Sequence, residues 1–202
     1  MSGLGKQLQK MVNSYSGTWS VYVKDLEKGG EICINDRAMY PASTIKAFVM
    51  ASTFDQIKKG KLSYNSVRGL RNGYKKTGCH SSLHPAASSF VSDGGSNSAS
   101  AKDCGVLLEN IYKGKCVSKR YSREMEKLLL RQTRRGKIPS GVPAGVKVAN
   151  KTGETSSVQH DMAIVYGKKT DYVICVFSST GNEGYSVQRI RDISRTAYNY
   201  LN

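Results

Sequence analysis

The spacing of apolar residues predicts a helix at each end of the chain. Between Gly5 and Tyr15, apolar side chains recur every three or four positions and would lie on one helical face. The same spacing returns between Tyr185 and Tyr200. The two faces consist of Leu8, Met11 and Val12 in the first helix and Val187, Ile190, Ile193 and Ala197 in the last. We therefore expect two amphipathic terminal helices, each with one face buried.

Alternation of apolar and polar residues predicts strands in an early and a late group. The early group is a hairpin in which Thr18–Asp25 and Glu31–Asn35 flank the turn Lys28-Gly29-Gly30. The late group consists of Val146–Asn150, His160–Tyr166 and Asp171–Phe177. Each segment has the length and the branched or aromatic residues that are typical of a strand.

Helical spacing also predicts helices between the two groups of strands. They are expected at Ser43–Lys59, at Lys102–Tyr112 and from Ser122 onward. Gly60 is a suitable residue to end the first of them. Ser100 and Asp103 form a pattern similar to a capping box at the start of the second.

The order helix, two strands, helices, three strands, helix indicates an α+β fold. The early and late strands can pair only if the two ends of the chain come together. We therefore expect one antiparallel sheet flanked by the terminal helices. The chain would form a single domain, with a sheet lobe of residues 1–40 and 144–202 and a helical lobe of residues 41–143. An active site would lie in the cleft between the lobes.

Charge suggests a partner, although it leaves two interpretations open. The 202 residues carry a net charge of +16, and ten basic residues lie between Lys113 and Lys137 against only Glu124 and Glu126. This region is either a solvated helix face or a surface for a polyanion such as an anionic cell-wall polymer. No nucleic-acid-binding motif accompanies the charge, so specific binding of nucleic acid is not expected. No run of 18 apolar residues occurs, so no transmembrane segment is expected, and residues 1–6 do not begin a signal peptide.

The cysteines and histidines show no metal-binding pattern. The five cysteines are odd in number, and their spacing matches no zinc motif. Cys104 and Cys175 lie within apolar patterns and are expected to be buried free thiols. Cys79 precedes His80, but adjacent side chains rarely face each other, so we do not expect them to act as a nucleophile pair.

Ser43 and Lys46 are the leading candidates for chemistry. Three positions apart on a helix, they would project from one face about one turn apart. A serine hydroxyl is a weak nucleophile, but a buried lysine that a nearby cation keeps partly neutral can accept its proton. Lys151, in the tripeptide Lys151-Thr152-Gly153, could supply that cation and bind a substrate carboxylate. Lys76-Thr77-Gly78 repeats the same letters without a strand pattern and is interpreted as a chance match.

The two motifs, in this order, resemble those of the class A β-lactamase and penicillin-binding-protein family. The resemblance covers most of the chain and is strongest in Pro41–Ala51 and Ala99–Ser179. It implies a β-lactamase-like fold and a serine acyl-enzyme that acts on β-lactams or D-alanyl peptides. It also implies a monomer located outside the cytoplasmic membrane that needs no metal and no cofactor.

The resemblance further implies a role for each site residue. The expected catalytic residues are Ser43, Lys46 and Lys151, and the expected substrate-binding residues are Thr152, Gly153 and Thr155. Ser43 would be the nucleophile and Lys46 its base, and Lys151 would orient the substrate carboxylate. The oxyanion hole would use the N–H of Ser43 and a second N–H on the strand after Gly153, near Thr155.

The stretch Leu62–Ser98 departs from the family pattern. It is rich in Ser, Gly, Asn and Lys and shows no helix or strand pattern. The family's Ser-x-Asn element has two partial matches: Ser63-Tyr64-Asn65, which lies too close to Ser43 in sequence, and Ser92-Asp93-Gly94, which lacks the Asn. No glutamate in this stretch could activate a hydrolytic water, and Asp93 is its only acid. We therefore expect a shortened helical lobe.

A last departure concerns the arginine that many relatives place beside the Lys-Thr-Gly strand. The local match is Gln159-His160-Asp161, so Arg134, Arg135 or Lys137 would have to replace it. Two functions remain open. One is an acyl-enzyme with impaired deacylation. The other is a non-catalytic relative that binds cell-wall material or a partner through its basic face.

Overall fold

The structure is a computed structural model that describes residues 1–62 and 97–202. Its helices are α1 (Ser2–Asn13), α2 (Ile45–Lys58), α3 (Ala101–Tyr112), α4 (Lys119–Leu130) and α5 (Glu183–Leu201), with short 3-10 helices η1 (Ala42–Thr44) and η2 (Ile138–Gly141). Its strands are β1 (Thr18–Asp25), β2 (Glu31–Ile34), β3 (Lys147–Glu154), β4 (Val158–Tyr166) and β5 (Tyr172–Ser179). The candidates Ser63-Tyr64-Asn65, Ser92-Asp93-Gly94, Lys76-Thr77-Gly78 and Cys79-His80 lie outside the described residues.

All these strands form one antiparallel sheet in the order β2-β1-β5-β4-β3. Val21 of β1 pairs with Ile34 on one side and with Val176 of β5 on the other. The early hairpin and the late strands therefore join as the alternation predicted. The predicted α+β class, with early and late strands in one sheet, is confirmed.

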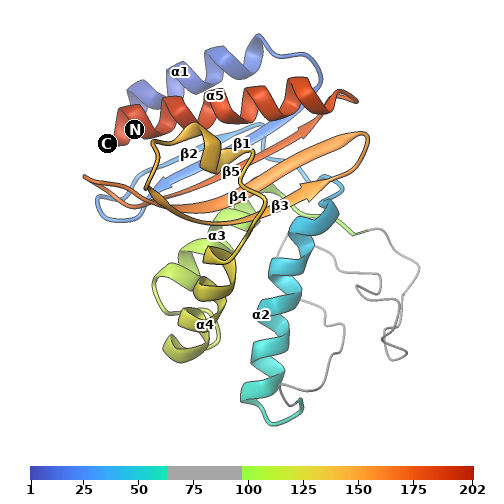
Figure 1. Cartoon of the computed structure of the whole chain (residues 1–202), viewed down its shortest axis with the longest axis vertical. Coiled ribbons are helices and arrows are strands. Elements are labelled where there is room, and N and C mark those ends of the chain that lie inside the picture. The colour runs from blue at the N-terminus through green and yellow to red at the C-terminus, as the bar shows by residue number, and fades with distance from the viewer. Residues whose placement is uncertain (63–96) are drawn as a thin grey trace.

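Helices cover both faces of the sheet (Figure 1). α1 and α5 lie side by side on one face, with the two chain ends close together, and α2, α3 and α4 lie on the opposite face. Each face has its own apolar core. The core beneath the terminal helices includes Leu8, Trp19, Val176, Ile190 and Ile193. The core on the other face includes Tyr22, Phe48, Leu107, Met125 and Phe177.

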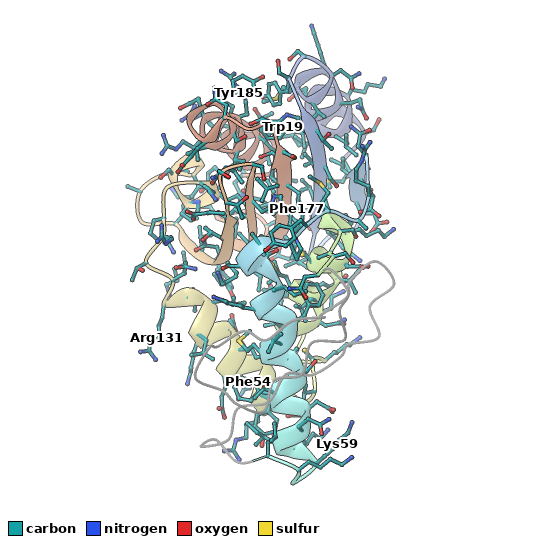
Figure 2. The ribbon with its side chains drawn as sticks, turned by 90° about the vertical axis from the view of Figure 1, so that its right-hand side faces the viewer. Trp19, Phe54, Lys59, Arg131, Phe177 and Tyr185 are labelled. Atoms are coloured by element: carbon teal, nitrogen blue, oxygen red, sulfur yellow. The ribbon has the colours of Figure 1, made fainter. Side chains whose placement is uncertain are left out.

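Aromatic residues mark the two cores in Figure 2. Trp19 and Tyr185 lie together on the side of the terminal helices, with ring centroids 6.4 Å apart. Phe54 lies far from them along α2, and Phe177 lies between, on the sheet. The amphipathic spacing of the terminal helices therefore reflects burial against the sheet, as expected.

Most predicted helix ends agree with the structure, but α4 begins at Lys119, earlier than Ser122. Ser118 caps this helix, because its hydroxyl accepts the N–H of Tyr121 at 3.3 Å. Ser122 is instead buried and donates to the carbonyl oxygen of Cys116. The predicted cap at α3 is confirmed, since Ser100 accepts the N–H of Asp103.

Cys104 and Cys175 are buried free thiols, as predicted. Burial raises the pKa of both thiols well above the ordinary value, so they remain protonated. Within the described residues, no helix is both long enough and apolar enough to cross a membrane.

Candidate active site

The segment that carries Ser43 is a single 3-10 turn at the start of α2. Ala42 has a φ of +47°, which is uncommon for a residue with a side chain. The hydroxyl and the N–H of Thr44 both donate to the carbonyl oxygen of Pro41, at 2.6 and 3.1 Å. Ser43 is thus held in a tight turn, and the strained backbone of Ala42 fixes the direction in which the chain enters that turn.

Gly153 lets strand β3 lie directly against this turn. A Cβ atom at this position would lie 2.6 Å from the carbonyl oxygen of Pro41 and 3.1 Å from the backbone nitrogen of Thr44. No side chain fits there without moving one of the two segments. The glycine of the Lys-Thr-Gly motif is therefore a packing requirement of the site.

A pocket of about 380 Å³ opens beside Ser43. Its lining residues are Ser43, Lys46, Gln132, Arg134, Lys151, Thr152 and Glu154. It brings together the predicted Ser43, Lys46, Lys151 and Thr152, although they come from η1, α2 and β3. Gln132 and Glu154 were not predicted as site residues.

The two lysines differ from the expectation in their burial. Lys46 was expected to be the buried, partly neutral base, but it is exposed. Burial acts on Lys151 instead and, with the positive charge of Lys46, lowers the pKa of Lys151 to about 8. The Lys151 ammonium donates to the carbonyl oxygen of Thr152 at 2.7 Å. Of the two lysines, Lys151 is thus the one that this environment pushes toward its neutral form.

Thr155 belongs to the turn between β3 and β4. Its N–H donates to the carbonyl oxygen of Val158 at 3.0 Å, so that N–H is not free for an oxyanion. Its hydroxyl accepts the N–H groups of Ser157 and Val158. Hydrogen-bonded and non-bonded pairs alternate along an antiparallel ladder, so the N–H of Glu154 faces the open side of β3, which is the edge strand. The free N–H after Gly153 is therefore that of Glu154.

Lys137 and Glu154 belong to a polar group that lines a cavity next to the pocket. The Lys137 side chain is only 5% exposed, and its ammonium donates to the carbonyl oxygens of His160 at 3.1 Å and Gly153 at 3.4 Å. It also lies 3.5 Å from a carboxylate oxygen of Glu154. The other Glu154 oxygen lies 3.4 Å from the guanidinium of Arg134. Burial lowers the pKa of Lys137, an effect that Glu154 opposes.

Asp161 is a fully buried carboxyl next to this group. It accepts the N–H of Ile138 and the side-chain amide of Asn150, both at 3.0 Å. Burial nevertheless raises its pKa to about 6. Of the three proposed substitutes for the family arginine, Arg134 lines the pocket and Lys137 lines the cavity next to it. Arg135 points elsewhere and donates to the carbonyl oxygen of Val148.

His160 links the sheet to the Ser43 turn. Its Nδ1 accepts the N–H of Ser178 at 3.1 Å, so the proton of the neutral ring lies on Nε2 and is donated to the carbonyl oxygen of Tyr40 at 2.9 Å. The ring stacks on Phe177 with centroids 4.1 Å apart. Burial lowers the pKa of His160 to about 4, which keeps the ring neutral.

Metal binding has no candidate in residues 1–62 and 97–202. No group of three or more His, Cys, Asp or Glu side chains is placed to hold an ion there.

Comparisons with known proteins confirm the predicted β-lactamase-like fold. The fold is similar to that of PBP-A, with a TM-score of 0.82, 18% identity, and coverage of 99% of this chain and 96% of that one. A β-lactamase from Sphaerobacter thermophilus has a TM-score of 0.79 and 16% identity, and the match covers 99% of this chain and 97% of that one. An ancestral class A β-lactamase has a TM-score of 0.80 and 14% identity, with coverage of 98% of this chain and 99% of that one. The comparison with curated protein sequences gave no match. A model of the beta-lactamase enzyme family matches residues 3–81 and 66–201. Because that match spans nearly the whole sequence, the chain belongs to the beta-lactamase enzyme family.

Proposed function

We propose that the protein is a serine acyl-enzyme that acts on β-lactams or D-alanyl peptides. The observation that carries this proposal is the single pocket that joins Ser43, Lys46, Lys151 and Thr152. A mutant of the structurally similar PBP-A has been solved as an acyl-enzyme complex with penicillin G, so this fold supports such an adduct.

In the proposed reaction, Ser43 Oγ bonds to the substrate carbonyl carbon while its proton passes to a neutral lysine. The C–N bond of the β-lactam or peptide then breaks, and the lysine returns the proton to the departing nitrogen. Lys46 is one helical turn from Ser43, and Lys151 is the lysine that burial makes easier to deprotonate. The N–H groups of Ser43 and Glu154 are proposed as the oxyanion hole. Thr152 and the charged form of Lys151 would hold a substrate carboxylate.

Deacylation is expected to be slow. Release of the acyl group needs a water that a general base deprotonates, and the only acid lining the pocket in the described part of the chain is Glu154. Its two oxygens are engaged by Arg134 and Lys137. Loss of a general base costs on the order of 10²–10⁴-fold in rate. The adduct should therefore accumulate.

Intact-protein mass spectrometry tests both steps. The protein is incubated with penicillin G, free penicillin is removed, and the adduct mass is followed over time. We expect an adduct that persists for minutes or longer. Release within seconds would identify a water-activating group that this proposal omits, with Asp93 as the first residue to replace. No adduct at any time would contradict the acyl-enzyme function.

A second candidate, binding without catalysis, is favoured by the surface of α4. Lys119, Arg123, Lys127 and Arg131 recur every four residues and are all exposed, and Figure 2 shows Arg131 on the outer side of the molecule. No ion pair joins these four residues to an acid in the described part of the chain. Like charges at this spacing destabilise a helix, so a ligand rather than the fold would account for them. We call these four residues the α4 basic stripe.

The stripe fits an anionic cell-wall polymer of the polyol-phosphate type. The test measures binding of poly(glycerol phosphate) to the Ser43→Ala protein, which isolates binding from catalysis. Replacing the stripe by glutamine should reduce the slope of log affinity against log salt by about 3, since each phosphate contact contributes roughly 0.7. Replacing Lys6, Lys10, Lys168 and Lys169, which are exposed elsewhere, is the matched control. If the slope falls equally in both variants, polymer binding depends on net charge alone and not on the α4 basic stripe.

The remaining expectations from the family are also proposals. We propose a monomer that works outside the cytoplasmic membrane, where β-lactams and cell-wall peptides are met. Sedimentation of the purified protein tests the first statement, and fractionation of cells that produce the full-length natural protein tests the second.

A further inference from the structure

Glu154 is the one acid among the described residues that line the Ser43 pocket. It directly follows the Lys-Thr-Gly motif on β3, two positions after Thr152, so the two side chains share a side of the strand. Its oxygens lie 3.4 Å from the Arg134 guanidinium and 3.5 Å from the Lys137 ammonium. Glu154 therefore forms ion pairs with Arg134 and Lys137, the two cations near the pocket that could replace the family arginine.

Glu154 and Arg134 lie between the Ser43 pocket and a neighbouring cavity, and they line both. That cavity has a volume of about 290 Å³ and shares Arg134, Thr152 and Glu154 with the Ser43 pocket. It is otherwise lined by Gly136, Lys137, Glu183, Val187 and Arg191. A substrate group that extends from the Ser43 pocket past Thr152 would reach Glu154 first.

Glu154 is also firmly held. The Lys137 ammonium is almost fully buried, and a buried charge is costly unless it is paired. Glu154 is the one carboxylate within ion-pair distance of Lys137 in the described part of the chain. A substrate carboxylate that displaced Glu154 would have to replace this pairing and would still lie near a like charge.

We propose that Glu154 is a specificity-determining residue that acts as an internal carboxylate at the cationic end of the pocket. It selects acyl donors whose leaving group ends in a neutral amide or ester, and it disfavours donors whose leaving group ends in a carboxylate. Lys46 and Lys151 are then the lysines of the pocket that are left to attract an acidic substrate. This inference rests on the acyl-enzyme function proposed above and names the substrate class of the same site.

The test uses two acyl donors that differ only in the terminal group: N-acetyl-D-alanyl-D-lactate, which ends in a carboxylate, and its D-lactamide analogue. The second-order acylation rate of Ser43 is measured for both with wild type and with Glu154→Gln, which keeps the shape and an acceptor for Lys137. The ratio of the acid rate to the amide rate should rise about tenfold or more in the variant, because a like charge is removed. The readout is the ratio within each protein, so an effect of the substitution on the oxyanion hole that is equal for both donors does not enter it.

Two control variants separate a specific role from general charge. Glu183→Gln removes an acid from the neighbouring cavity that forms no ion pair or hydrogen bond with Arg134 or Lys137 within the described residues, and it should leave the ratio unchanged. Glu154→Asp keeps the charge and should retain most of the wild-type preference. If Glu154→Gln does not fold, Glu154→Thr is a neutral residue suited to a strand and carries the same test. An unchanged or lower ratio in the neutral variants, or an equal rise with Glu183→Gln, would overturn the proposal.

A binding experiment separates this proposal from the acyl-enzyme function. In a Ser43→Ala background, calorimetric titration measures the affinity of the same two compounds with and without Glu154→Gln. A shift toward the acid supports the role of Glu154 even if the wild type forms no adduct, in which case only the catalytic proposal fails. If the preference does not shift, the role of Glu154 is disproved whether or not Ser43 is acylated.

Discussion

The Nε2 atom of His160 lies 2.9 Å from the backbone carbonyl oxygen of Tyr40, and this hydrogen bond joins the sheet to the segment that carries the proposed nucleophile. The opposite ring nitrogen is fixed by the N–H of Ser178. The ring is therefore fixed at both nitrogens and holds the carbonyl group of Tyr40, and Ser43 follows three residues later.

Replacing His160 with phenylalanine should slow acylation more than it harms the fold. The new ring can still stack on Phe177, but both hydrogen bonds are lost, at a cost of roughly 1–3 kcal/mol in unfolding free energy. We expect about a tenfold loss in acylation rate, because the Ser43 turn loses its tie to β4. Adduct formation and chemical denaturation measure the two effects. An acylation rate equal to that of wild type would show that the Tyr40 tie does not position Ser43.

The pH dependence of stability should change in opposite ways when His160 and Asp161 are replaced. The pKa of His160 is lowered to about 4, so the neutral ring stabilises the fold above the unfolded pKa of about 6.5. This contribution to the free energy of unfolding is lost as pH falls toward 4. The raised pKa of Asp161, about 6, means that its carboxyl destabilises the fold increasingly as pH rises from about 4 to 6. Each effect amounts to roughly 3 kcal/mol.

The stability of His160→Phe should therefore approach that of wild type as pH falls from 6.5 to 4. Asp161→Asn should gain stability relative to wild type as pH rises over the same range. The change in its hydrogen bonds adds a difference in stability that does not depend on pH. Urea unfolding at pH 4, 5, 6 and 7 provides both comparisons. Parallel curves for wild type and either variant would show that the group does not titrate as its burial requires.

Ser43→Ala should abolish labelling by penicillin or an activated ester and leave the circular dichroism spectrum unchanged. The reason is that Ser43 is the hydroxyl that shares the pocket with both lysines. Ser140→Ala, which changes an exposed serine outside the pocket, should label like wild type. Labelling that persists in Ser43→Ala, or that maps by peptide digestion to Ser63 or Ser92, would assign the nucleophile elsewhere.

The two lysines should be distinguishable by substrate and by pH. Lys46→Ala should lose on the order of 10²–10⁴-fold in acylation with every substrate if it is the base. Lys151→Ala should harm carboxylate substrates more than neutral esters. In wild type, the ratio of the carboxylate rate to the neutral-ester rate should fall as pH rises through about 8, where Lys151 becomes neutral. The reason is that this deprotonation removes the cation proposed to bind the substrate carboxylate. Identical profiles for both substrates would argue against a carboxylate-binding role for Lys151.

Gly153→Ala should separate β3 from the Ser43 turn. The added Cβ would lie 2.6 Å from the carbonyl oxygen of Pro41, so one segment must move. We expect a loss of about 1–3 kcal/mol in stability and of about 100-fold in acylation. Gly184→Ala is the matched control, since its Cβ would meet only a side-chain oxygen of Asn182 at 3.9 Å. Normal acylation in Gly153→Ala would show that the close approach is not needed.

Alternation and spacing predicted the fold well because they record which face of each element is buried. The bounds of β1 match the prediction, and its pairing with β5 follows from the order of elements. The pattern also brought Ser43, Lys46, Lys151 and Thr152 into one site. These residues have fixed positions within their elements, so a motif is enough to orient them.

The parts that could not be predicted depend on contacts between distant segments. Lys46 was expected to be buried, but burial is decided by the elements that pack around it, and these leave Lys46 exposed and enclose Lys151. The N–H of Thr155 is engaged by the turn hydrogen bond to Val158, which spacing does not reveal. Glu154 stands beside the motif, yet its pairing with Arg134 and Lys137 depends on how the segment after α4 returns to the sheet.

The position of β1 inside the sheet, between β2 and β5, has a consequence for how the protein is made. Asp25 pairs with Tyr172, so the strand that is synthesised first in this sheet can pair only after β5, the last of its strands, has been synthesised. The β3–β4–β5 meander is local in sequence and can form early, but closing the sheet across most of the chain is slow. Until then β1 and β2 have an open edge that is prone to pair wrongly. We expect the sheet to close only after β5 has been synthesised, and chaperone dependence to exceed that of a helical protein of similar size.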